Sequence, residues 1–547
     1  MIIVEFCLLG PNFGRIGRVS TRNTSVRDVT WERLRAQVQE TNPDLQDPLD
    51  VAAVLESLGW TDRQIEDRFG ASNVFEAAEE LFSEIRRQVT QNPMPIRVTI
   101  TRKALVWSVF RDIGHGLTFT LPMIVSVAAM ITLHISFSSY LYFSVPDATA
   151  IALATFLSFL TTGGFTQAMT HIYYVLMGMQ KIQEIEATVF LVMRWSLLVT
   201  LFFGMLVIVG DFVFPIMPES LVLLMILYTV LLSMLWLSFT GLYILRREYW
   251  LTFITAFAIF VAYALHSRGI AVQWAQVAAM LIASLTGMGT SLIIFRRRTR
   301  GFQALRGVFK TRLAQLAHGA SPYFLYGLLY FVFVYMDRLV AWSSQTSYLP
   351  YNIWFRGQYE LGMDWSLVAL FLPLSLAEVL ISTVMRRIEN LEHQLSVRKH
   401  EELLRSIRRT YFRMLGIFVA VSALGVILTH IGVSLLAPLK LFRLSVPVRG
   451  VEPFVFMWSS WAYVLLSVAI FNVLMLFTLS HPRPALMVLG YGIGLDLLSG
   501  VLATQLLNGY QYAVLGLFLS CVFVAVYSTR TLLQLLPQLD YFLYRLT

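Results

Sequence analysis

Charged side chains interrupt several long apolar stretches of this sequence, and these residues are the best candidates for a chemical role. The stretch YGLLYFVFVYMDRLVAW, residues 326–342, carries Asp337 and Arg338. Neighbouring residues on a helix point about 100° apart, so the two are poorly placed to pair with each other. Tyr330 lies on the same helical stripe as Asp337. Two interpretations remain open for the charges, an interfacial anchor and the lining of an outward-facing vestibule for a polar substrate.

Three more ionisable residues lie inside apolar stretches, where charge is expensive and is often functional. Asp496 has Gly492 and Gly500 one turn away on either side. This small face should point at another helix or a cavity, for an interhelical hydrogen bond or for contact with a substrate or cation. Glu378 shares a face with serines, which fits a pathway lining or a packed polar seam. Arg194 has apolar neighbours and is expected to snorkel toward lipid head groups. Arg194, Gln167 and Tyr330 are also candidates for lining a substrate pathway, together with Asp337, Arg338, Glu378 and Asp496.

The composition is that of a membrane protein. Of the 547 residues, 57% are hydrophobic and 14% are charged, whereas soluble proteins have about 25% charged residues. Two distant cysteines imply neither a disulfide framework nor a cysteine metal site. The net charge is +9, although residues 31–90 hold 13 acidic and 6 basic residues. The basic excess lies in short loops, which indicates membrane topology rather than nucleic-acid binding.

Twelve apolar stretches are long enough to cross a bilayer, which takes about 20 residues. The predicted fold is therefore an all-α polytopic membrane protein with two lobes of six helices. The predicted spans are roughly 117–142, 147–179, 187–210, 219–244, 248–267, 272–295, 321–343, 365–385, 412–436, 453–479, 484–506 and 511–529.

The loop charges predict the orientation. With the N-terminus inside, the inside loops hold 18 Lys and Arg residues and the outside loops hold 5. This bias predicts cytoplasmic N- and C-termini. Two inside loops, 296–320 and 386–411, are long and basic, which suits contact with anionic membrane lipid or docking of a cytoplasmic partner. The first of them divides the membrane part into lobes at 101–313 and 314–547.

Residues 1–100 contain no spanning segment and predict a small helical cytoplasmic head. Asp47 is a plausible N-cap, and Thr61 and Gln64 have capping-box spacing. Leu58 and Phe75 are among the apolar residues expected in its core. The head is interpreted as a docking module or a spacer.

Several activities lack their sequence signatures. There is no Walker A loop and no HExxH motif. The largest predicted outside loop, 344–364, is too small to be a catalytic domain. We therefore expect a protein that is not an enzyme and has no catalytic residues, no cofactor and no metal site.

The sequence resembles a known family in three places. Span seven, GLLYFVFVYMDRLVAW, is similar to that family's Gly-x-x-Tyr followed by an acidic–basic pair and Trp, with Arg338 where the family has Lys. Span two, TTGGFTQAMTHIYYVL, contains its Thr-Gly, Gln167 and Thr-x-x-Tyr. MLWLSFTGLYILRREYWLTFITAFAIF resembles its fourth and fifth spans. The family is that of the PelG-like inner-membrane transporters of the Pel exopolysaccharide system, in the multidrug/oligosaccharidyl-lipid/polysaccharide (MOP) flippase superfamily.

The resemblance implies twelve helices around a central cavity and export of a polysaccharide or lipid-linked saccharide by alternating access across the cell inner membrane. It also implies partners, namely a cytoplasmic glycosyltransferase and other membrane proteins of a synthase complex. A drug antiporter of the same superfamily is the first alternative. A non-conducting scaffold that docks the glycosyltransferase is the second.

Overall fold

A computed structural model gives the architecture. It divides the chain into two compact units, one spanning Phe13–Ser108 and the other holding the membrane helices. Apart from single positions between them, the described residues are 47–91, 120–130, 132–179, 181–213, 217–299, 313–346, 351–370, 400–439, 450–478 and 481–536.

The smaller unit is a helical head with helices α3 (Pro48–Ser57), α4 (Asp62–Phe69) and α5 (Val74–Gln91). The Asp47 carboxylate accepts a hydrogen bond from the Asp50 amide at 2.9 Å, so the predicted N-cap is confirmed. Leu55, Ile65 and Leu81 are buried in its core. Leu58 and Phe75 are 40% and 54% exposed, so their placement in the core was wrong. Leu58 is the C-cap residue of α3 and Phe75 lies in the first turn of α5, so both are at helix ends.

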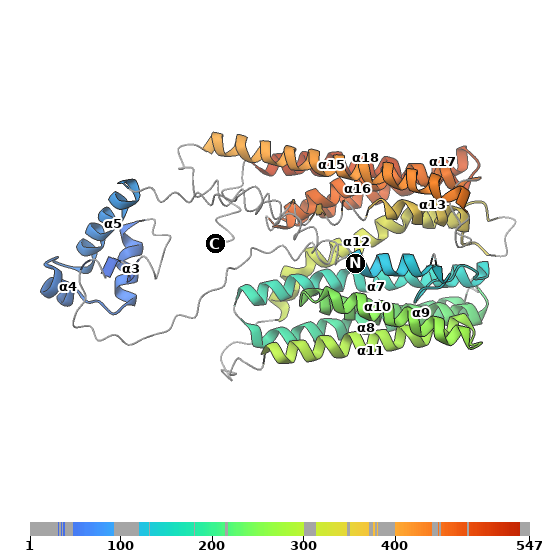
Figure 1. Cartoon of the computed structure of the whole chain (residues 1–547), viewed down its shortest axis with the longest axis horizontal. Coiled ribbons are helices and arrows are strands. Elements are labelled where there is room, and N and C mark those ends of the chain that lie inside the picture. The colour runs from blue at the N-terminus through green and yellow to red at the C-terminus, as the bar shows by residue number, and fades with distance from the viewer. Residues whose placement is uncertain are drawn as a thin grey trace. The chain divides into compact units, whose positions relative to one another are not determined.

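The N-terminal half of the membrane unit forms one helical group, here called the N-lobe. Consecutive helices run in opposite directions (Figure 1), and the group buries a shared apolar core. They are α7 (Val145–Gly178), α8 (Ile182–Val213), α9 (Glu219–Ile244), α10 (Glu248–Ser267) and α11 (Val272–Thr299).

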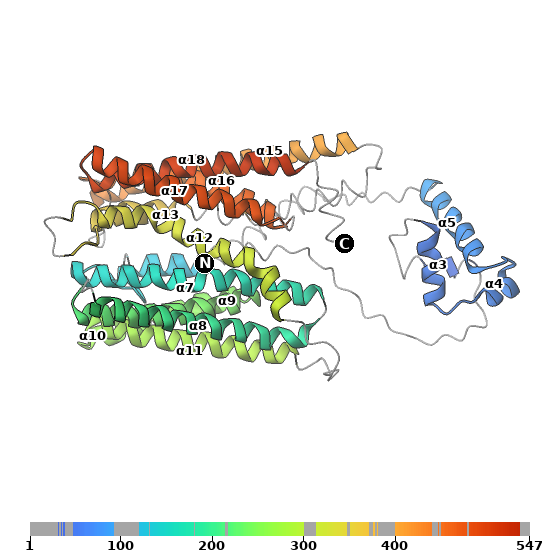
Figure 2. The ribbon, with the colours of Figure 1, turned by 180° about the vertical axis from the view of Figure 1, so that it is seen from behind.

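The C-terminal half forms the second group, the C-lobe, with its own core. Figure 1 and Figure 2 show the two groups side by side, with α12 at their junction. The C-lobe helices are α12 (Leu313–Ser343), α13 (Gly357–Val368), α15 (His400–Leu439), α16 (Glu452–Thr478), α17 (Arg483–Leu506) and α18 (Ala513–Leu535).

Ten helices among the described residues are long and apolar enough to cross a membrane. They coincide with ten of the twelve predicted spans. The predicted first span is described as a shorter helix, Thr120–Met130, followed by a turn in which Ile135 and Tyr140 form an antiparallel bridge. The helical prediction for 133–142 was therefore wrong, since Gln276 of α11 donates to the Ser136 carbonyl at 3.0 Å and holds the turn. Most of predicted span eight, and most of loops 296–320 and 386–399, lies outside the described residues.

A crossing of two glycine-bearing helices joins the lobes. A Cβ on Gly327 of α12 would clash with the Gly163 carbonyl of α7, and one on Gly164 would lie 2.8 Å from the Phe324 carbonyl. Glycine is required here because the two backbones touch. Small residues bring membrane helices together in this way, since lipid provides no hydrophobic force between them.

This contact predicts that Gly327→Ala destabilises the protein by about 1–3 kcal/mol, because the added methyl group overpacks the crossing. Equilibrium unfolding in mixed detergent micelles, followed by circular dichroism, measures the change. Gly319→Ala on the same helix is the matched control, since its Cβ would have no atom within 4 Å. Equal effects of the two substitutions would contradict the assignment of the crossing.

Candidate functional site

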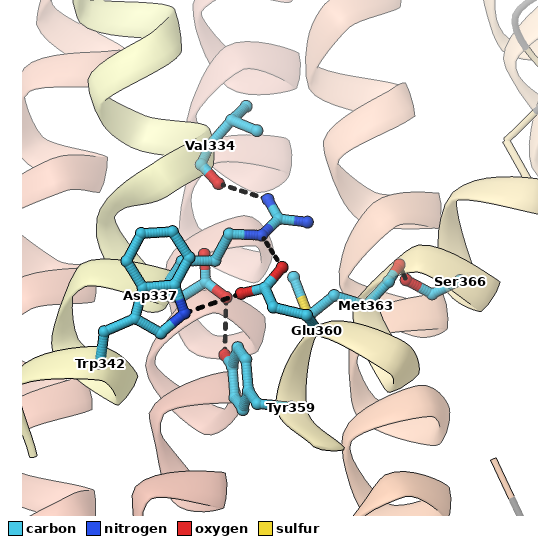
Figure 3. A network of polar contacts seen from close by, with 8 residues as sticks. Val334, Asp337, Trp342, Tyr359, Glu360, Met363 and Ser366 are labelled. Atoms are coloured by element: carbon cyan, nitrogen blue, oxygen red, sulfur yellow. Dashed lines mark hydrogen bonds and ion pairs between the residues drawn. The ribbon is translucent and has the colours of Figure 1, made fainter. Parts of the chain in front are cut away.

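A buried ion pair lies between α12 and α13. Arg338, 6% exposed, donates from Nε to Glu360 Oε2 at 2.9 Å. Its Nη1 donates to the Val334 carbonyl at 3.3 Å. Trp342 Nε1 donates to the other carboxylate oxygen, Glu360 Oε1, at 3.0 Å. Figure 3 shows this network. Both oxygens of Glu360 are therefore used, which is the condition under which a charge pair tolerates burial.

Asp337 has a different partner from its neighbour. The Tyr359 hydroxyl donates to Asp337 Oδ2 at 2.6 Å, and the Asp337 side chain is fully buried (Figure 3). The prediction that Asp337 and Arg338 make separate contacts is confirmed. Both side chains face the interior of the C-lobe rather than its surface, so in this structure they neither anchor at an interface nor line an open vestibule.

Sequence reasoning missed Tyr359 and Glu360. Both fall in 344–364, which was predicted to be a loop, whereas α13 begins at Gly357. The loop prediction failed because α13 is short and only half apolar. The sequence feature that could have predicted them is the adjacent pair Tyr359-Glu360, which offers a hydroxyl donor for Asp337 and a carboxylate for Arg338.

Asp496 of α17 lies level with Asp337. A Cβ on Gly492 would be 3.1 Å from Phe333, and one on Gly500 would be 3.6 Å from Val340. The two contacts lie on either side of Asp496 along α17 and on either side of Asp337 along α12, so the two aspartates are at the same height. The small face predicted around Asp496 therefore packs against α12, and the side chain is fully buried.

Three oxygens of these two carboxyl groups have no partner. Among the described residues, Asp337 Oδ1 and both Asp496 side-chain oxygens are buried and accept no hydrogen bond. Burying an unpaired carboxylate costs several kcal/mol, so such a group binds a proton or a cation. The pair has the chemistry of a site for a small positive ion.

The other predicted site residues lie elsewhere. Gln167 of α7 is 1% exposed, and its side chain lies at the glycine crossing, beside Gly327. Tyr330 is buried and stacks on Tyr326, with ring centroids 6.3 Å apart. Arg194 is exposed on α8, among apolar neighbours, which fits the snorkelling interpretation. Glu378 lies outside the described residues.

Aromatic rings line the junction of the lobes along α7 and α12. Phe159 stacks on Phe331 with centroids 4.5 Å apart and planes 5° apart. Farther along the same junction His171 stacks on Tyr323 at 3.9 Å. Each pair joins one ring from each lobe, so the rings part when the lobes separate. No group of three or more His, Cys, Asp and Glu residues that could hold a metal ion is found in the part of the chain that the structure describes.

Comparisons with known proteins identify the architecture. Neither the family models nor the curated proteins match the sequence. The Vibrio cholerae MATE transporter VcmN in its bent form does match in structure, at 14% identity and a TM-score of 0.53, covering 80% of this chain and 99% of that one. This chain has the fold of the MATE transporters.

Two further solved structures support the same conclusion. An inward-facing multidrug resistance MATE family transporter of the MOP superfamily is 14% identical, with a TM-score of 0.51, and covers 77% of this chain and 95% of that one. An outward-facing one is 13% identical, with a TM-score of 0.52, and covers 79% and 96%. The predicted all-α polytopic fold is confirmed, and it is the fold of these MATE transporters.

The Trp342 contact predicts a stability difference between two tryptophans. Trp342→Phe removes a hydrogen bond to a buried charge and is expected to cost about 1.5–3 kcal/mol in the free energy of unfolding. Trp458→Phe is the control, because Trp458 Nε1 is buried and has no hydrogen-bond partner among the described residues. Its substitution is expected to cost less, and unfolding in mixed micelles compares the two. A larger loss for Trp458→Phe would contradict the role of Trp342.

Proposed function

We propose that this chain is a cation-coupled membrane transporter whose coupling site is the carboxyl pair Asp337 and Asp496. The observation that carries the proposal is the set of three buried, unpartnered carboxyl oxygens inside a MATE-like fold. A transporter without an ATPase motif needs another energy source, and a site that binds a proton or a sodium ion supplies one.

The pair is suited to a small cation because of its charge and its size. Two facing carboxylates repel each other, and either a proton or a sodium ion between them removes that repulsion. Small residues let α17 approach closely enough for the pair to act together. An ion bound there would change the charge of α12, the helix that also carries the junction with α7.

Asp496→Asn is expected to weaken sodium or proton binding by about tenfold or more, because the amide removes half of the negative charge. Radioactive sodium binding and proton uptake by the purified full chain measure the two ions separately. Asp211→Asn is the matched control. Asp211 is a buried carboxylate of the N-lobe that already accepts a hydrogen bond from the Met217 amide at 3.3 Å.

Each result of that experiment decides something. A loss confined to sodium binding assigns sodium as the coupling ion, and a loss confined to proton uptake assigns the proton. A wild-type chain that binds neither ion at this pair, or an Asp496→Asn variant that binds both unchanged, sinks the coupling proposal.

The transported substrate that we favour is a saccharide, either a growing polysaccharide or a lipid-linked one. Its support is the row of aromatic rings at the lobe junction, because aromatic faces stack on sugar rings, together with the resemblance of spans two and seven to the PelG-like exopolysaccharide transporters. Tyr330 and Gln167 are the pathway candidates nearest that junction, and Arg338, Glu378 and Arg194 remain candidates farther from it.

The proposed setting is a cell inner membrane with both chain termini in the cytoplasm. There the acidic head and the basic loops would contact a cytoplasmic glycosyltransferase and other membrane proteins of a synthase complex. The MATE-like fold favours a second candidate function, drug antiport, to the same degree as saccharide export.

Transport assays on proteoliposomes separate these candidates. We expect the wild-type chain to carry a fluorescent neutral oligosaccharide along an imposed ion gradient, and Tyr330→Ala to reduce that flux by about fivefold, since one stacking ring contributes about 1 kcal/mol. Leu325→Ala, at an exposed position of the same helix, is the control. Flux of a hydrophobic cationic dye without the oligosaccharide indicates the antiporter, and flux of neither substrate indicates the scaffold.

A further inference from the structure

Two adjacent residues of α13 meet two adjacent residues of α12. Tyr359 donates to Asp337 at 2.6 Å, and Glu360 accepts from Arg338 at 2.9 Å. Neighbouring residues on each helix diverge by about 100°, so each pair of contacts occupies its own side of the helix. On α13, Tyr359 therefore binds the acidic residue of α12 and Glu360 binds the basic one (Figure 3).

Both side-chain oxygens of Glu360 accept a hydrogen bond, whereas among the described residues only one oxygen of Asp337 does. Glu360 Oε2 accepts from Arg338 and Oε1 accepts from Trp342. Asp337 uses Oδ2 for Tyr359, while its Oδ1 is without a hydrogen bond in the described part of the chain. A cation that enters this cluster therefore finds an oxygen without a hydrogen bond on Asp337, whereas each Glu360 oxygen already accepts one.

Arg338 is a potential competitor of the cation for Asp337 Oδ1. Its guanidinium is buried and cannot lose its proton, so it requires a carboxylate partner inside the C-lobe. Asp337 and Arg338 diverge by about 100° along α12, and they make separate contacts while Glu360 is present. The long Arg side chain can still rotate to reach the adjacent carboxylate once its own partner is removed. Without Glu360 the guanidinium would turn to Asp337 and replace the cation.

We infer that Glu360 is a positioning residue that holds Arg338 away from Asp337 and so keeps the Asp337–Asp496 pair available to a cation. Trp342 and the Val334 carbonyl complete the hold, since they fix the carboxylate and the guanidinium in place. The inference rests on the proposed coupling site and adds the group that regulates its charge.

The decisive variants are Glu360→Gln and the double substitution Glu360→Gln with Arg338→Met. In the purified full chain, Glu360→Gln is expected to weaken binding of radioactive sodium, or proton uptake, by about tenfold or more, because Arg338 then neutralises Asp337. The double variant is expected to bind within about threefold of the wild type, since it has no guanidinium to compete. A merely structural role for Glu360 would not give this rescue.

Glu219→Gln is the control, because it makes the same change at an exposed glutamate in the first turn of α9, in the other lobe. It is expected to bind the ion as the wild type does. Wild-type binding by Glu360→Gln overturns the inference, and so does a double variant that stays weak. If Glu360→Gln does not fold, Glu360→Asp takes its place. The shorter Asp side chain keeps the negative charge but reaches Arg338 less well. We expect Glu360→Asp to weaken ion binding less than Glu360→Gln would. Ion binding by Glu360→Asp equal to that of the wild type then overturns the inference.

A second measurement separates this inference from the coupling proposal. Asp337→Asn is expected to lower the unfolding temperature more in the Glu360→Gln background than in the wild type, because only there does Asp337 pair with Arg338. This comparison needs no bound ion. Absence of ion binding in the wild type therefore refutes the coupling site, whereas equal temperature shifts in the two backgrounds refute the positioning role of Glu360.

Discussion

The buried ion pair between Arg338 and Glu360 is the interaction on which the C-lobe depends. Charges inside a membrane protein are tolerated where every donor and acceptor finds a partner. Trp342 and the Val334 carbonyl supply the remaining partners. The pair thereby joins α13 to α12. Gly362 of α13 then packs against α16, where a Cβ would lie 2.9 Å from Val455.

Glycines at the helix contacts determine how closely the helices that carry Asp337 and Asp496 approach each other. Gly492 and Gly500 let α17 lie against α12, and Gly516 of α18 lies where a Cβ would be 2.6 Å from the Gly500 Cα. These contacts bring Asp496 level with Asp337. The lobes use the same device at Gly163 and Gly327, because close backbone approach replaces the hydrophobic force that lipid does not provide.

Helix α12 takes part in both arrangements. Phe331 on one side of the helix stacks against α7 of the N-lobe, whereas Asp337 on another side contacts α13. Since a helix moves largely as a rigid rod, a movement of one lobe against the other also acts on the carboxyl cluster. In the proposed transporter this single helix couples ion binding to the separation of the lobes.

Local chemistry was readable from the sequence. Spans such as 219–244 and 248–267 were predicted to the residue, because about 20 apolar residues in a row have few alternatives to a membrane helix. The divergence of Asp337 and Arg338 and the small face around Asp496 follow from helical geometry alone. These features depend on residues within a few turns of one another.

The partners of those residues were decided by the tertiary structure. Glu360 lies in a segment that is too short and too polar to be read as a helix, and it meets Arg338 22 positions away in the sequence. The turn after Met130 was predicted to be part of a continuous span. The sequence gives no local sign of the turn, because Gln276, far along the chain, holds its backbone. A sequence determines which groups must be satisfied in an apolar interior, whereas packing between distant helices determines which groups satisfy them and which oxygens stay free for an ion.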